Sequence, residues 1–173
     1  MVRLSNPQET RINLALAGNE QQIKWLKRYL RLRGIDTNPI CMCLIGYIGS
    51  RKQARVARSE TRSMIRRFKG VAVGKRIGNA WKKNRFRSAY LRNTLWDLGY
   101  AVDTLETAVT WDRVDTAMEM IERVVGESLV SWNEKVHCFS HLSHVYPSGS
   151  SVYTTFVFRL ANTPEETLGR WQA

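Results

Sequence analysis

Residues 135–160 constrain the fold most, because they predict two antiparallel strands joined by a tight turn. The two runs KVHCFSHLSHVY and SVYTTFVFRL are rich in β-branched and aromatic residues, which favour strands. Between them lies the segment PSGS, and proline, serine and glycine are typical of hairpin turns. We therefore expect a β-hairpin and, with it, an antiparallel sheet.

Alternation along the hairpin predicts which side chains share a face. In the second strand the even-numbered positions from Val152 to Leu160 are mostly large and apolar, and they share one face. In the first strand His137 and His141 fall on one face and His144 on the other. Because no carboxylate or cysteine completes a ligand set with these histidines, we expect no metal site.

The remaining segments predict helices and further strands. Asn6, Ser50 and Thr163 are suited to N-cap positions. Strands are expected in 40–49, a continuous apolar run typical of a strand buried on both faces, and in 101–111. Residues 71–85 are rich in glycine and lysine and predict a loop with one short strand. Helices are expected in 3–18, 19–34, 51–70, 85–99, 111–126 and 162–173.

The length and the order of these elements indicate one fold class. A chain of 173 residues is long enough for one well-cored domain and short for two. We therefore expect a single α+β domain over residues 1–173, in which helices cover an antiparallel sheet in the ferredoxin-like style.

The net charge of +12 is unevenly distributed along the chain. Residues 51–99 hold 15 Lys and Arg against two acidic residues, a net charge of +13, so the rest of the chain sums to −1. Such a section faces solvent, an anionic ligand, an acidic protein surface or nucleic acid. Nearby aromatic residues such as Phe68 and Trp81 suit nucleic acid, but the section contains no recognisable nucleic-acid motif.

Cysteine content and hydropathy indicate the compartment. The three cysteines, Cys41, Cys43 and Cys138, form no even disulfide framework and no zinc pattern. No apolar run approaches the ~20 residues of a membrane span, and no signal peptide is evident. We expect reduced, mostly buried thiols in a cytoplasmic protein.

Arg3, Arg92 and Tyr146 are candidate site residues. Arginine binds carboxylates and phosphates through paired hydrogen bonds, and Arg3 and Arg92 stand apart from the general arginine run. From the residues alone, surface ion pairing is the simpler explanation of both. Tyr146 directly precedes the turn, where a phenol can act as an acid or base, although a packed strand aromatic is the simpler explanation there too.

Three stretches together resemble a known family. They are VRLSNPQET, RFRSAYLRNTLWDLGYAVDTLETAVTW and SHVYPSGSSVYTTFVF. They resemble the C-terminal substrate (cap) domain of FAD-linked oxidases of the vanillyl-alcohol oxidase superfamily, and within it the alkyldihydroxyacetonephosphate synthase branch with its bacterial relatives. The resemblance runs from about residue 2 to the end of the chain.

The resemblance implies a cofactor and a set of site residues. FAD would be held mainly by a separate flavin domain of the same polypeptide, and the cap domain would close the substrate site over the flavin. Tyr146 takes the position of the catalytic tyrosine, and Arg3 and Arg92 take positions of substrate-site arginines. Glu106 and His144 are implied to line the same site. The substrate would be an anionic or lipid-like small molecule.

The chain also departs from the family pattern. The flavin domain and the histidine-rich stretch that follows the last helix are missing, so we expect a fragment of a larger enzyme that is inactive alone. The parent would be a FAD-linked oxidase or dehydrogenase, or a synthase that exchanges an acyl for an alkoxy group. A homodimer stays open, and the alternative to this interpretation is a small basic α+β module that binds nucleic acid.

Overall fold

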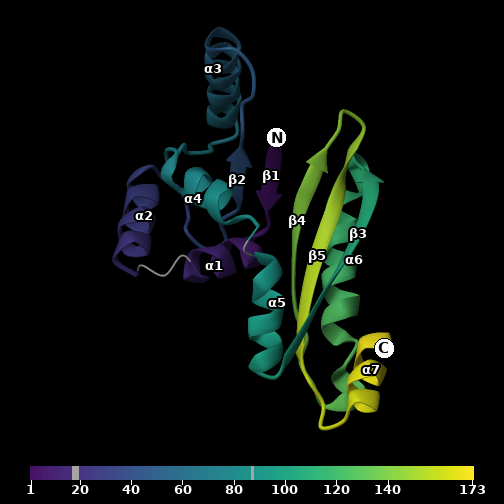
Figure 1. Cartoon of the computed structure of the whole chain (residues 1–173). Coiled ribbons are helices and arrows are strands. Elements are labelled where there is room, and N and C mark those ends of the chain that lie inside the picture. Colours follow the sequence, from purple (N-terminus) through teal and green to yellow (C-terminus); the bar gives the residue numbers. More distant parts are fainter. Residues whose placement is uncertain (17–19, 87) are drawn as a thin grey trace. The chain divides into compact units, whose positions relative to one another are not determined.

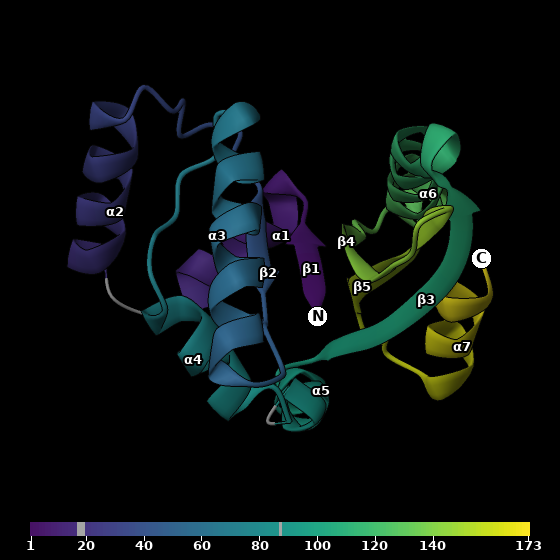
Figure 2. The ribbon, with the colours of Figure 1, turned by 90° about the horizontal axis from the view of Figure 1, so that it is seen from above.

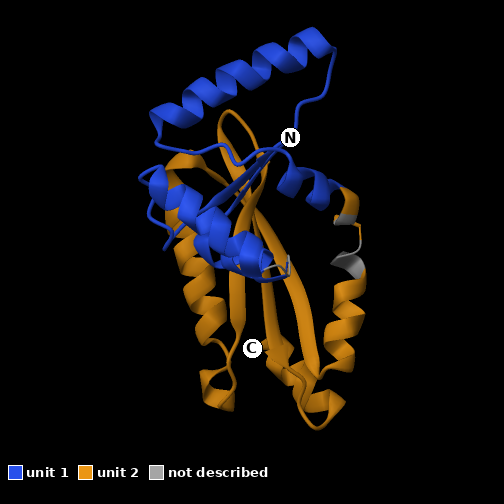
Figure 3. Ribbon diagram, turned by 90° about the vertical axis from the view of Figure 1, so that its left-hand side faces the viewer, with its two compact units in different colours: residues 1–82 blue, residues 83–173 orange. Residues whose placement is uncertain are grey.

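The chain divides into two compact units, residues 1–82 and 83–173 (Figure 3), and each is described by itself. The computed structural model describes residues 1–16, 20–86 and 88–173. The predicted end of the first helix and start of the second, at residues 17–19, lie outside the described residues. Whether the two units act as the single predicted domain stays a prediction.

The first unit is built on a short pair of antiparallel strands. β1 (Val2–Ser5) pairs with β2 (Met42–Ile45). The hydroxyl of Thr10, on α1, accepts a hydrogen bond from the backbone N–H of Met42 at 3.0 Å and donates to the carbonyl of Ser5 at 3.4 Å. This buried threonine therefore connects the helix to both strands. The helices of this part of the chain are α1 (Pro7–Leu16), α2 (Glu20–Leu32), α3 (Arg51–Arg67) and α4 (Arg76–Asn84), whose last residues pass into the second unit.

Several sequence predictions for this unit were wrong. The apolar run 40–49 forms a strand of only four residues, of which Leu44 alone is buried, so it is not a strand covered on both faces. Val2–Ser5, predicted to precede or start a helix, is a strand. Residues 76–84, predicted to lie in a loop, form α4, in which Ile77 and Trp81 are half-buried one helical turn apart.

The second unit contains three antiparallel strands, with helices around them (Figure 1). β5 (Gly149–Arg159) lies between β4 (His137–Val145) and β3 (Tyr100–Thr110). Figure 2 shows α6 (Val114–Glu127) along β4 and β5, both of which it contacts. The remaining helices are α5 (Ser88–Asp97) and α7 (Pro164–Gln172), and α7 begins with the predicted Thr163 cap.

The predicted alternation of the hairpin is confirmed along β5. Val152, Thr154 and Phe158 are all buried, whereas Tyr153 and Arg159 on the other face are not. The even-numbered face packs against a core cluster that includes Ala101 and Leu129. The α+β class with antiparallel strands and helical cover is therefore confirmed.

The thiols differ from the prediction. Cys138 is buried, but Cys41 and Cys43 are exposed. Burial, with a smaller contribution from the negative charge of Glu122, raises the pKa of Cys138 to about 12. Partial burial also raises the pKa values of Cys41 and Cys43 above the ordinary thiol value.

These environments predict how the thiols react. With Ellman's reagent at about pH 8, Cys41 and Cys43 should be modified in the native protein, because the reagent can reach them. Cys138 should react only after denaturation, because it is both buried and protonated. Counting the released chromophore before and after adding guanidinium distinguishes the two classes. Three rapidly reacting thiols in the native state would contradict the position of Cys138 in the core.

The hairpin also predicts a sharp contrast between two glycines. A Cβ at Gly149 would overlap the backbone carbonyl of Val109, whereas a Cβ at Gly126, inside α6, would meet nothing within 4 Å. Gly149→Ala should therefore lower the free energy of unfolding by about 2 kcal/mol or more, because backbone must move. Gly126→Ala, in the last turn of α6, should leave it unchanged or raise it by up to about 0.5 kcal/mol, because alanine favours the helix over glycine. Urea unfolding of both variants checks the pair, and equal effects would contradict the β3–β5 register.

Candidate functional site

A β-bulge near the turn of the second unit positions the candidate site. The β4–β5 register passes from Leu142 opposite Val152 to Val145 opposite Ser150, so β4 contains one extra residue there. The hydroxyl of Ser150, which is buried, donates to the carbonyl of His144 at 2.9 Å and holds the bulged backbone. A bulge of this kind redirects side chains.

The predicted direction of the His144 side chain was wrong, because the bulge turns it to the other face of the sheet. Strict alternation would direct it away from the face that carries His141. Instead, its Nδ1 lies 3.5 Å from Oε1 of Glu106, a β3 residue on the same face as His141. The Ser143 hydroxyl donates to the same carboxylate oxygen at 2.6 Å and lies 3.1 Å from Nδ1 of His144. We call Glu106, Ser143 and His144, together with the adjoining Tyr146, the hairpin cluster.

Electrostatics within the hairpin cluster favour an ionised carboxylate. The hydrogen bond from Ser143 is the main cause that lowers the pKa of Glu106 below its ordinary value. The hydrogen bond and positive charge of His144, with a smaller contribution from His141, act in the same direction, and slight burial opposes them. The cluster therefore holds a negative charge beside an imidazole.

Tyr146 is held by its backbone and leaves its side chain accessible. Its N–H donates to the carbonyl of Gly149 at 2.9 Å, and its own carbonyl accepts from the indole N–H of Trp111 at 3.1 Å. The same indole donates to the carbonyl of Pro147 at 3.1 Å. The ring lies parallel to that of His144, with 6.5 Å between centroids and 16° between planes, and the residue is 53% exposed. A bound molecule can therefore reach a phenol whose backbone is fixed.

The same sheet face carries a row of polar residues whose alignment the sequence did not predict. Glu106, Tyr153 and His141 are directly opposite one another across β3, β5 and β4. The rings of His141 and Tyr153 lie 4.9 Å apart. Alternation places each residue on a face, but only the strand register aligns them. The contact of His144 with Glu106 had no sequence signal, because it depends on the bulge.

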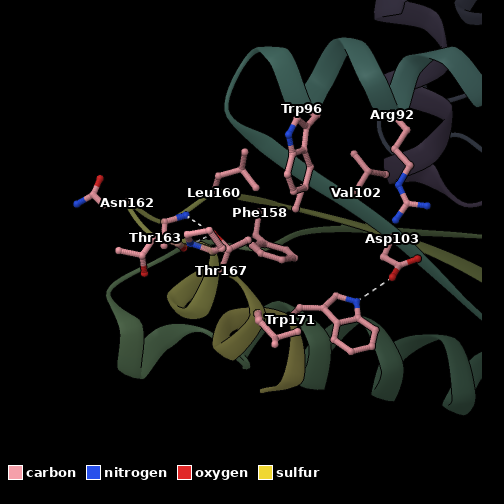
Figure 4. Close-up of a pocket in the computed structure, with 14 residues that line it drawn as sticks. Arg92, Trp96, Val102, Asp103, Phe158, Leu160, Asn162, Thr163, Thr167 and Trp171 are labelled. Carbon is pink, nitrogen blue, oxygen red and sulfur yellow. Dashed lines mark hydrogen bonds between the residues drawn. The ribbon is translucent and has the colours of Figure 1, made fainter.

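Arg92 lies at the other end of the second unit. It lines a cleft of about 570 Å³ together with Trp96, Asp103, Phe158, Trp171 and neighbouring residues (Figure 4). The indole of Trp171 donates to Asp103 at 2.8 Å, as Figure 4 shows. Asp103 is seven residues from Thr110, the β3 residue opposite Gly149, which corresponds to about 23 Å along a strand. The structure therefore does not bring Arg92 and Tyr146 together.

Arg3 belongs to the first unit, where it has a structural partner. Its guanidinium contacts Oε1 of Glu9 at 2.6 Å, and the Glu9 side chain is almost fully buried. The backbone N–H of Glu9 donates to the side chain of Asn6 at 2.8 Å, which confirms Asn6 as the cap of α1. An anionic ligand at Arg3 would compete with this carboxylate.

Metal-ligand clusters and membrane-spanning helices are both absent from the described part of the chain. Among residues 1–16, 20–86 and 88–173, no group of three or more His, Cys, Asp or Glu side chains is placed to hold a metal ion. Within the same residues, no helix combines the length and the apolar character needed to cross a membrane.

Sequence comparison relates the chain to flavoenzymes. Residues 1–172 match the family described as FAD linked oxidases, C-terminal domain. Two curated relatives are alkyldihydroxyacetonephosphate synthases, from Dictyostelium discoideum (25% identical) and from Trypanosoma brucei brucei (22% identical). Each match covers 90% of this chain and 26% of the relative, so the chain spans about a quarter of those proteins.

Structural comparison agrees on the fold. A solved alkyldihydroxyacetonephosphate synthase superposes on 99% of this chain and 32% of its own length, with a TM-score of 0.79 and 23% identity. A second structure of such a synthase gives a TM-score of 0.75 over 98% of this chain. With a family match over nearly every residue, the chain belongs to the FAD linked oxidases, C-terminal domain family.

Proposed function

We propose that this chain is the substrate-binding cap domain of a FAD-dependent enzyme, in which Tyr146 acts as acid and base on the substrate. The observation that carries the proposal is the hairpin cluster, where a phenol, an imidazole and a carboxylate lie together beside one turn. The family membership and the alkyldihydroxyacetonephosphate synthase relatives support it. The parent enzyme is then an oxidase, a dehydrogenase or a synthase of that kind.

FAD would supply the electron chemistry of such an enzyme. The hairpin cluster fits a position beside it, because its groups hold and move protons and carry out no electron transfer themselves. We assign the binding of FAD's phosphates to a flavin domain of the same polypeptide. The chain alone is accordingly expected to be colourless and inactive.

The hydrogen bonds of the hairpin cluster define a proton arrangement. A hydroxyl has one proton, and that of Ser143 is donated to Glu106, so the Ser143 oxygen accepts from a protonated Nδ1 of His144. The carboxylate near Nδ1 favours the tautomer that carries its proton on this nitrogen. The imidazole is thereby fixed in orientation, with its ring stacked 6.5 Å from the ring of Tyr146. Tyr146 would give or take the substrate proton, and His144 would position it.

The Arg92 cleft supports an anionic, lipid-like substrate. Three aromatic side chains, Trp96, Phe158 and Trp171, line it with the one guanidinium of Arg92, a combination that suits an apolar body with an acidic group. Because the cleft lies at the far end of β3 from Tyr146, we assign it to a remote part of an extended substrate. Arg3 has a structural role in this proposal, because its ion pair with Glu9 fixes β1 against α1.

The proposed role of Tyr146 predicts a specific loss of turnover. In the flavoenzyme that contains this chain, Tyr146→Phe should lower kcat by about 100-fold or more, the usual contribution of an acid or base, with FAD content unchanged. Tyr100→Phe is the matched control, because Tyr100 is also partly exposed but lies at the opposite end of β3. Near-normal turnover of Tyr146→Phe would exclude it from the chemistry.

The proton arrangement predicts the titration of Glu106. Ser143→Ala removes the main cause of the lowered pKa, so the Glu106 carboxyl should titrate at a higher pH. Because the pKa of Glu106 is lower in the folded state, its interactions stabilise the fold at pH values above the ordinary carboxyl pKa. This stabilisation is lost as the pH falls through the lowered pKa of Glu106. Carboxyl-detected NMR titration measures the shift, and Ser148→Ala in the turn is the control. An unchanged Glu106 titration would contradict the Ser143 contact.

A further inference from the structure

The two units carry charges of opposite sign. Residues 1–82 hold 18 Lys and Arg against four Asp and Glu, a net charge of +14, whereas residues 83–173 hold nine against 11, a net charge of −2. The proposed chemistry at Tyr146 uses only the second unit and leaves this positive charge unexplained. An excess of this size attracts anionic surfaces.

Helix α2 has an exposed apolar stripe in addition to its inward face. Its inward face carries Leu30, which is buried. On the outer side Trp25, Tyr29 and Leu32 recur at i, i+4 and i+7, and they are 68%, 40% and 79% exposed. Residues at this spacing lie along one line of a helix. We call these three residues the Trp25 stripe.

A line of cations runs directly beside the Trp25 stripe. Lys24, Arg28 and Arg31 each precede one stripe residue and so repeat the same spacing. The Arg28 guanidinium lies 5.7 Å from the centre of the Trp25 ring. An exposed aromatic and aliphatic line flanked by basic residues is the composition of helices that lie in the boundary of a lipid bilayer.

Helix α3 adds a second basic surface in the same unit. Its arginines at positions 51, 55, 58, 62 and 66 recur every three or four residues and so form one stripe. Within residues 1–16, 20–86 and 88–173, no ion pair involves this stripe, and like charges at this spacing repel one another. No residue of α3 is buried, and Phe68 at its end is 82% exposed. An anionic surface would relieve the repulsion along the stripe.

We propose that the first unit binds the surface of an anionic lipid bilayer, with the Trp25 stripe in the headgroup boundary. Trp and Tyr favour that boundary because their rings are apolar and their N–H or O–H groups stay hydrated. Lys24, Arg28 and Arg31 would pair with lipid phosphates while their methylene stems lie along the apolar groups. Nucleic acid would satisfy the charges but would leave aliphatic residues such as Leu32 exposed. This inference goes beyond the proposed function and does not depend on Tyr146.

Vesicle cosedimentation of the 173-residue chain tests the proposal. The chain should sediment with phosphatidylcholine vesicles that contain phosphatidylglycerol, and the bound fraction should fall as salt is raised. It should bind vesicles of phosphatidylcholine alone much more weakly, because the electrostatic attraction is then absent. Equal binding to both vesicles, or binding to neither, would overturn the proposal.

Two sets of variants locate the contact. Charge reversal of Lys24, Arg28 and Arg31 to Glu should weaken binding by about 100-fold or more, since each basic residue near the surface contributes about fivefold. Trp25→Ser with Leu32→Ser should weaken it at least tenfold while preserving the charge. The matched controls in the second unit are Arg113, Arg123 and Lys135 to Glu, and Met120→Ser with Val124→Ser on exposed positions of α6. Both controls should bind as the unchanged chain does, and circular dichroism confirms folding.

A random single-stranded oligonucleotide is the competing ligand. If the oligonucleotide displaces the chain from vesicles and the Trp25 and Leu32 variant binds vesicles normally, the surface is an electrostatic nucleic-acid site and the proposal is wrong. If the serine variant loses vesicle binding but keeps its affinity for the oligonucleotide, the apolar stripe is specific for lipid. Neither result depends on flavin or on turnover. The membrane proposal can therefore be wrong while the proposed role of Tyr146 is right, and the reverse.

Discussion

The arrangement of the second unit depends on the register between β3 and β5. Eleven residue pairs join the two strands, and Gly149 lies so close to Val109 that no other residue fits there without backbone movement. Because β5 is also the partner of β4, this register and that of β4 with β5 together set which residues of all three strands are opposite each other. The row of Glu106, Tyr153 and His141 follows from these two registers.

The β-bulge then makes the candidate site out of this regular sheet. Without the extra residue, strict alternation would direct His144 away from Glu106. With it, the imidazole and the Ser143 hydroxyl both reach the same carboxylate oxygen. Trp111 contributes from the end of β3, because its indole binds two carbonyls at the turn and so fixes the backbone of Tyr146. The bulge next to the turn therefore distinguishes this hairpin from a regular one, because it brings His144 to Glu106.

The parts of the fold that were predicted correctly are those with local causes. The hairpin depends on turn residues, the alternation of β5 on a two-residue period, and the N-cap of α3 on Ser50 itself. The parts missed depend on partners distant in sequence. β1 has only four residues and forms because β2 pairs with it. α4 forms although Gly78, which disfavours a helix, lies within it. Likewise Tyr146 came from a family resemblance, whereas its contact with His144 required the fold.

Separation along β3 limits what a substrate can be. Arg92 and Tyr146 were implied to serve one site, yet about 23 Å of strand lies between the cleft and the turn. A small hydroxy acid cannot contact both, so either the two residues bind opposite ends of an elongated molecule or only one of them contacts the substrate. An amphiphile with a long apolar chain meets the first condition and also partitions into lipid. A basic first unit that binds a bilayer surface and a second unit with an aromatic-lined cleft would then serve the same substrate class by separate contacts.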